Sequence, residues 1–227
     1  MIKIVCISDT HCQLDKVKLP KGDILVHAGD ALSRGTFNEF TEFMGHMEQI
    51  KDDYKHVIYV PGNHDRITEI NEFIVKQECK SKDIIYLNDT GIELEEIKFW
   101  GSGVTPRFHN WAWNRDSGTS GTSYRKDHID YDPIQKHWDL IPKDTEILIT
   151  HGPPKGYLDK SVYDGKQCGC EYLLKKIKKI NPKYHIFGHI HYYGGQVDFL
   201  NKNTTLVNAA VCNEQYQPKN KIVVLEY

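Results

Sequence analysis

The stretch HVIYVPGNHD, residues 56–65, joins a short apolar run to a cluster of polar residues. The run His56–Val60 is typical of a buried β-strand, and Gly62-Asn63-His64-Asp65 follows it almost directly. In α/β proteins, functional residues concentrate where strands end and loops begin. The stretch therefore predicts an α/β fold with a polar site at the end of this strand.

Four more segments repeat this arrangement of an apolar run followed by polar residues. They are Asp9-Thr10-His11, Gly29-Asp30, Thr150-His151-Gly152 and Gly188-His189-Ile190-His191. The runs that precede or lead into them are Ile2–Ile7, Ile24–His27, Ile147–Thr150 and His185–Phe187. One such segment has a large false-positive risk, but five in one chain predict a single site that holds two metal ions.

The remaining apolar runs complete a layered α/β pattern. Further strands are expected at Thr205–Val207 and Ile222–Leu225, and a second group at Ile84–Leu87, Ile92–Leu94 and Ile97–Trp100. Thr36 and Glu39 have the spacing of a capping box. Helical spacing follows at Phe37, Phe40, Met44, Met47 and Ile50, so this face is expected to pack on the sheet. A later helix is expected from Tyr172 to Ile180, ending before Pro182.

Length and composition fit one globular domain spanning residues 1–227, with a polar loop insertion at about 114–133. A net charge of −2 argues against stable binding to nucleic acid or to an anionic membrane. No apolar run has the length of a transmembrane helix. The six cysteines form no Cys-x-x-Cys pair, so we expect free thiols and a cytoplasmic location.

Most of the 12 histidines need no special role. His27 and His185 lie in apolar runs and are expected in the core or behind the metal ligands. Four others lie in polar stretches and are expected to be solvated: His46, His56, His128 and His137.

The chemistry of the five segments points to transition metals. Carboxylate, amide and imidazole ligands suit Mn, Fe, Zn, Co or Ni better than Mg or Ca, because so many of the donors are nitrogen. Two ions need a carboxylate to bridge them, and Asp30, at the end of a central strand, is placed for that. Such a pair can share a hydroxide that attacks a phosphorus ester.

The five segments, in this order, resemble the calcineurin-like metallophosphoesterases. Longer motifs resemble the MPPED-like branch, also called 239FB-like: residues 25–30, 110–114, 137–142, 149–154, 169–171, 185–191 and 208–213. The resemblance covers nearly the whole chain. It implies a four-layer αββα sandwich of two mixed β-sheets flanked by helices.

The resemblance also implies roles for individual residues. Asp9, His11 and His191 would hold the first metal, Asn63, His151 and His189 the second, and Asp30 would bridge the two. Two divalent transition-metal ions are therefore expected, with Mn²⁺ favoured over Fe, Zn, Ni or Co. His64 would act as the general acid on the leaving oxygen. Asp65 would either orient His64 or stabilise the turn.

The expected activity is hydrolysis of a small phosphodiester by the metal-bridging hydroxide, with cyclic nucleotides among the candidates. Arg107, His109 and Trp111 are candidate substrate contacts, and Trp111 would stack on a base or pack as part of a cap. The alternatives are a phosphomonoesterase or a nuclease on the same site, or a non-catalytic binding or scaffold protein that reuses the fold. The sequence leaves the oligomeric state open.

Overall fold

The computed structural model describes residues 1–117 and 132–227, and most of the loop expected at 114–133, including His128, lies outside these residues. The first of its two large sheets has the order β13-β1-β2-β3-β4. The strands are β1 (Lys3–Ile7), β2 (Ile24–Ala28), β3 (His56–Val60), β4 (Ile85–Tyr86) and β13 (Val223–Glu226). All neighbours are parallel except β13, which pairs antiparallel with β1.

The second sheet has the order β11-β12-β10-β9-β6-β5. Its strands are β5 (Thr90–Leu94), β6 (Ile97–Ser102), β9 (Ile147–Thr150), β10 (Tyr184–Phe187), β11 (Val197–Phe199) and β12 (Thr205–Asn208). The four inner strands are parallel, and β5 and β11 are antiparallel edges. A small parallel pair, β7 (Thr105–Pro106) and β8 (Asn114–Arg115), lies apart.

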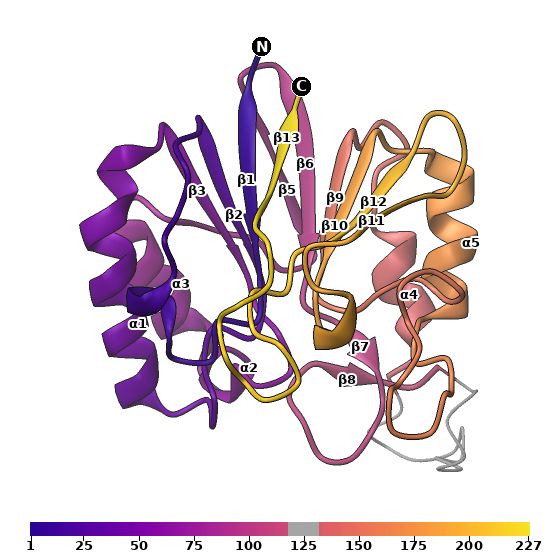
Figure 1. Cartoon of the computed structure of the whole chain (residues 1–227), viewed down its shortest axis with the longest axis horizontal. Coiled ribbons are helices and arrows are strands. Elements are labelled where there is room, and N and C mark those ends of the chain that lie inside the picture. Colours follow the sequence, from indigo (N-terminus) through magenta and orange to yellow (C-terminus); the bar gives the residue numbers. More distant parts are fainter. Residues whose placement is uncertain (118–131) are drawn as a thin grey trace.

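Helices cover the outer face of each sheet, so the fold is the expected four-layer αββα sandwich (Figure 1). On the first sheet lie α1 (Phe37–Ile50) and α3 (Glu72–Ser81), and on the second α4 (Ile134–Asp139) and α5 (Glu171–Ile180); the short α2 (Arg66–Ile70) follows β3. Among the described residues, no helix is long and apolar enough to cross a lipid bilayer.

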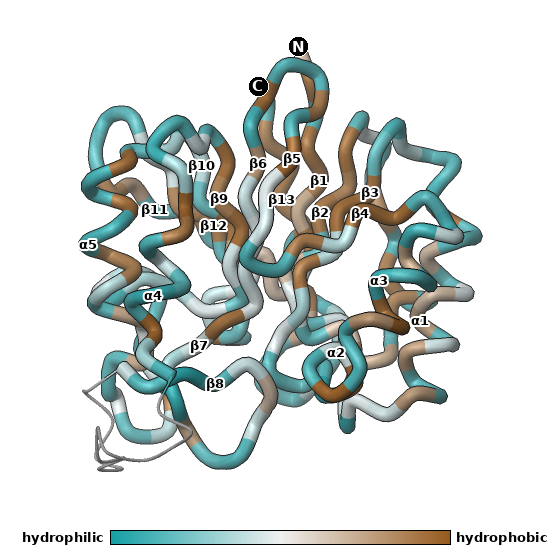
Figure 2. The backbone as a smooth tube through the Cα atoms, turned by 180° about the vertical axis from the view of Figure 1, so that it is seen from behind, coloured by the Kyte–Doolittle hydropathy of each residue, from teal (hydrophilic) through white to brown (hydrophobic). Residues whose placement is uncertain are grey.

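Alternation along the strands divides the core into three layers. In β1, Ile4 and Cys6 face the second sheet, whereas Val5 and Ile7 face α1. The central cluster joins residues from both sheets, and the strands form the most apolar part of the backbone in Figure 2. Because β1, β2 and β3 run parallel, their carboxyl ends meet at the lower end of Figure 1.

Three details differ from the sequence expectations. The run Ile84–Leu87 was grouped with β5 and β6, but its strand β4 pairs with β3 in the first sheet. Phe37, the first residue of α1, is exposed rather than packed on the sheet. His137 was expected to be solvated, but it is buried between Asp89 and Asp132, with distances of 2.6 and 3.2 Å.

Candidate metal centre

Asp9, His11 and His191 come together at the carboxyl end of β1. Their ligand atoms lie within 4.8 Å of one another. Asp9 is fully buried, and its carboxylate accepts hydrogen bonds from the Ser8 hydroxyl (2.5 Å) and from the backbone N–H of His189 (3.0 Å). Burial alone would raise the pKa of Asp9, but the hydrogen bond and charge of His191 outweigh it and lower that pKa.

The two imidazoles of this cluster are oriented as metal ligands are. His11 Nδ1 lies 3.1 Å from the carbonyl of Leu32, and His191 Nδ1 lies 3.0 Å from the carbonyl of Asn213. If each Nδ1–H donates to its carbonyl, each Nε2 keeps a lone pair, and the two Nε2 atoms are 3.1 Å apart. Two facing lone pairs repel unless a cation lies with them, so this donor set fits a metal ion.

Asp30, His151 and His189 form a second cluster, again with ligand atoms within 4.8 Å. His151 Nε2 lies 3.2 Å from Asp30 Oδ2 and 3.0 Å from Asn63 Oδ1, while its Nδ1 lies 3.0 Å from the carbonyl of Ala28. All four expected ligands therefore converge on one point. Two oxygens and two imidazoles fit a divalent transition metal.

The pKa values of this cluster show how it is prepared for a cation. Burial lowers the pKa of His189 to about 3, so its ring is neutral and can donate a lone pair. Burial also works against a charged His151, but the Asp30 carboxylate outweighs it and raises the pKa of His151 to about 9. A metal ion must therefore displace a proton from His151.

Asp30 connects the two clusters. It belongs to the group with His151 and His189, and also to a group with His11 and His64. This is the position that a bridging carboxylate requires. Asp9, His11, Asp30 and His189 all have positive φ angles, from 42° to 70°, which non-glycine residues rarely adopt and which cluster at functional sites.

Two glycines of the sequence motifs allow the segments to approach each other. A Cβ on Gly62 would collide with the backbone and carboxylate of Asp30, and one on Gly188 would collide with Ser8 and Asp9. The close packing of the strand ends therefore requires glycine at both positions.

His64 lies beside the clusters, and its Nδ1 is 2.6 Å from the carbonyl of Ser33. If Nδ1 donates to Ser33, Nε2 is the atom left for chemistry. Asp65 has the contacts of the turn-stabilising role: its carboxylate accepts from the N–H groups of Gly62 (2.7 Å) and Leu32 (2.9 Å). Within the described part of the chain, it forms no hydrogen bond with His64.

A pocket of about 820 Å³ opens over the two clusters and includes all three candidate substrate contacts in its wall. Arg107 pairs through Nε with Asp116 at 2.8 Å. His109 has a positive φ and lies near Phe108, with ring centroids 5.9 Å apart. The ring of Trp111 lies against His64, with centroids 4.2 Å apart and planes at 30°.

The sequence analysis missed several groups at this site. The carbonyls of Leu32, Ser33 and Asn213 orient three imidazoles, but a backbone carbonyl has no signature in sequence. It also missed wall residues from two distant segments, 161–169 and 214–216. Only the fold brings those segments to the metal ligands.

Comparison with known proteins agrees with this geometry. The family model described as calcineurin-like phosphoesterase matches residues 2–193. Metallophosphoesterase domain-containing protein 1 of Homo sapiens is 34% identical over 248 residues, covering 99% of this chain and 70% of the human protein. A UPF0046 protein of Caenorhabditis elegans is 34% identical over 235 residues, covering 98% of this chain and 74% of that protein.

A likeness among solved structures supports the fold alone. The crystal structure of a phosphopantetheinyl hydrolase from Mycobacterium tuberculosis superposes with a TM-score of 0.66 at 13% identity. The match covers 98% of this chain and 95% of the other.

Proposed function

Because the chain belongs to the calcineurin-like phosphoesterase family, whose members are metal-dependent phosphoesterases, we propose that it is a phosphodiesterase with a dinuclear metal centre. The observation that carries this proposal concerns Asp30 at the base of the pocket. Asp30 groups with His151 and His189, and it also groups with His64 and with His11, which belongs to the Asp9 cluster. Mn²⁺ is the proposed native ion, and cyclic nucleotides remain candidate substrates.

The proposed roles are metal binding and proton donation. Asp9, His11 and His191 would hold one ion, Asn63, His151 and His189 the other, and Asp30 both. When bound, the ions would supply positive charge to the phosphoryl oxygens and to the attacking water. His64 Nε2 donates a proton to the leaving oxygen as its bond to phosphorus breaks, and the Ser33 carbonyl holds the ring for this step.

The size of the pocket supports a diester. A volume of about 820 Å³ exceeds what a phosphate group fills, and the wall reaches well beyond the metal ligands to the segment 161–169. A diester carries a substituent on each side of the phosphorus, and the wall offers surface for the second one. The six free cysteines support a reducing, cytoplasmic setting.

The direct test is hydrolysis of bis-p-nitrophenyl phosphate beside p-nitrophenyl phosphate. Protein stripped with a chelator would be reloaded with Mn, Ni, Zn, Fe or Mg, and His64→Ala would serve as the inactive control. Metal-dependent cleavage that favours the diester supports the proposal. Preference for the monoester would make the protein a phosphomonoesterase, and fewer than one ion per chain after reloading would favour a binding protein.

A further inference from the structure

Glu214 is an acidic residue of the pocket wall that the proposed reaction does not use. It lies in the loop after β12 and is half-buried. Its Oε1 atom is covered and has no hydrogen-bond partner among the described residues. A polar oxygen that has lost water without gaining a hydrogen-bond partner costs free energy, so a donor or a cation placed beside Oε1 would be stabilising.

The other ionic side chains of the wall have partners. Arg107 pairs with Asp116 at 2.8 Å, and Lys166 pairs with Asp164 at 2.9 Å. Apart from the metal centre, Glu214 is thus the acidic side chain of the described wall that has no ion pair. Glu214 therefore adds to this part of the wall a carboxylate that has no ion-pair partner among the described residues.

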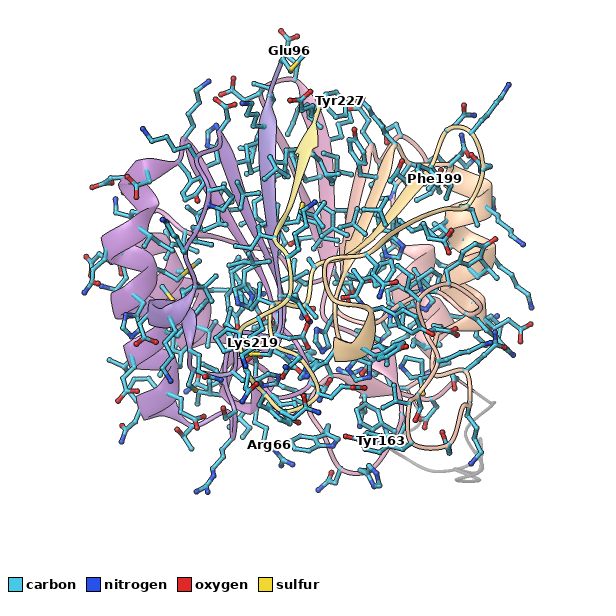
Figure 3. The ribbon with its side chains drawn as sticks, in the orientation of Figure 1. Arg66, Glu96, Tyr163, Phe199, Lys219 and Tyr227 are labelled. Carbon is cyan, nitrogen blue, oxygen red and sulfur yellow. The ribbon has the colours of Figure 1, made fainter. Side chains whose placement is uncertain are left out.

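Two tyrosines, Tyr163 and Tyr216, line the same pocket as Glu214. The ring of Tyr216 packs against His11 and His191, with centroid distances of 4.8 and 5.1 Å, and Tyr216 is 48% exposed. Tyr163, in the segment 161–169, is 88% exposed and lies at the same end of the molecule as Arg66 (Figure 3).

Building on the proposed phosphodiesterase function, we propose that Glu214, Tyr163 and Tyr216 bind a positively charged ammonium group of the substrate. A carboxylate attracts the charge, and aromatic faces bind quaternary ammonium groups through cation–π contacts. The substrate class is then a zwitterionic phosphodiester, whose phosphate lies at the metal centre and whose ammonium lies against this wall. A nucleobase offers hydrogen-bond donors without the positive charge, so it gains less here.

Two chromogenic diesters that differ only in charge test this proposal. They are p-nitrophenyl phosphorylcholine and p-nitrophenyl 3,3-dimethylbutyl phosphate, in which carbon replaces the ammonium nitrogen. We expect metal-loaded wild-type protein to favour the choline ester in kcat/KM by about three- to tenfold. Glu214→Gln should bring the ratio close to one while leaving hydrolysis of the 3,3-dimethylbutyl ester, which lacks the ammonium, within about twofold.

Matched variants separate binding from folding effects. Tyr163→Leu changes an exposed side chain and should also lower the ratio, whereas Glu171→Gln, on α5 and paired with Lys175, should leave it unchanged. Equal rates for the two esters in wild type, or a ratio unaffected by Glu214→Gln, would overturn the ammonium site while the phosphodiesterase stands. Failure to cleave bis-p-nitrophenyl phosphate and both esters would overturn the phosphodiesterase and this inference with it.

Discussion

The floor and the wall of the pocket are built differently. The floor, at and beneath the base of the pocket, consists of the seven proposed metal ligands and His64, which follow strand ends. Most of these residues are buried, and the Nδ1 atoms of His11, His151 and His191 lie within hydrogen-bond distance of backbone carbonyls. The wall comes from loops and includes side chains as exposed as Tyr163. Rigid placement suits groups that hold ions and move protons, whereas exposed loops suit groups that select a substrate.

Among the changes to the floor, removing the carboxylate of Asp30 should have the largest effect on metal binding and hydrolysis. Asp30→Asn removes a carboxylate that groups with His151 and His189 and also with His11 of the Asp9 cluster. We therefore expect loss of bound metal and a fall in diester hydrolysis on the order of 10³-fold or more. Elemental analysis of reloaded protein and the bis-p-nitrophenyl phosphate assay measure both. Asp198→Asn, on the edge strand β11, is the matched control. Two retained ions per chain would show that Asp30 does not bridge.

His64→Ala tests whether the floor separates ligands from catalyst. His64 Nδ1 is engaged by Ser33. His64 groups with His11 and Asp30, but the other two groups of possible ligands do not include it. We expect the variant to keep its metals and to lose turnover by roughly 10²–10⁴-fold. His46→Ala on α1 provides the control, since this residue lies outside the pocket. Loss of metal in His64→Ala would assign His64 to the ligands.

The gathering of the proposed ligands was largely predictable from sequence because each follows an apolar run, and parallel strands bring their carboxyl ends together. The predictions that were wrong depended on information that local sequence does not contain. The run Ile84–Leu87 has the composition of a strand, but composition does not say which sheet it joins. His137 sits among polar residues, and only the fold places Asp89 beside it.

The wall was harder to predict because its residues follow no periodic pattern. Arg107, His109 and Trp111 were found from one aromatic segment, and the structure does line the pocket with them. Glu214 stands far along the chain in a polar loop, where an acidic residue is ordinary. That its Oε1 atom has no hydrogen-bond partner in the described part of the chain is a property of the folded protein alone.

Asp65→Asn tests whether Asp65 stabilises the turn or orients His64 for catalysis. Burial and then the charge of Asp30 raise the pKa of Asp65 to about 7, and its oxygens accept from the N–H groups of Leu32 and Gly62. An amide leaves one of these donors without an acceptor, so we expect unfolding free energy to fall by about 1–3 kcal/mol. Denaturant melts measure this loss. If Asp65 oriented His64 instead, the kcat of the metal-loaded Asp65→Asn variant would fall as much as that of His64→Ala.

His27 and His185 support the floor from behind and should make it acid-sensitive. Burial lowers the pKa of each to about 3, against an ordinary 6.5, and their Nε2 atoms contact the hydroxyls of Thr10 and Thr150. Above pH 6.5 neither state binds the proton. Below pH 6.5 the unfolded chain binds the proton and the folded protein does not. The free energy of unfolding therefore decreases as the pH is lowered, by about 2 kcal/mol per ring at pH 5.

Urea unfolding of chelator-treated protein at pH 7.5 and pH 5 measures this dependence. His185→Gln retains a polar group for Thr150 but does not titrate, so its loss of stability between the two pH values should be smaller than that of wild type by about 2 kcal/mol. His56→Gln, at a partly exposed ring, is the control. An unchanged difference would mean that His185 is charged in the folded protein.

Trp111 belongs to the wall by position but contacts the floor, and replacing it should have the smallest effect. Its ring packs on His64, and the Arg66 guanidinium lies 5.1 Å from its centroid, anchored to the carbonyl of Asn110 at 2.6 Å. A ring engaged in this way offers less surface to a nucleobase. We expect Trp111→Leu to lower kcat by up to about tenfold with little change in KM, and Trp111→Phe to restore most of it. A rise in KM confined to nucleotide substrates, at unchanged kcat, would instead show that Trp111 stacks on the base.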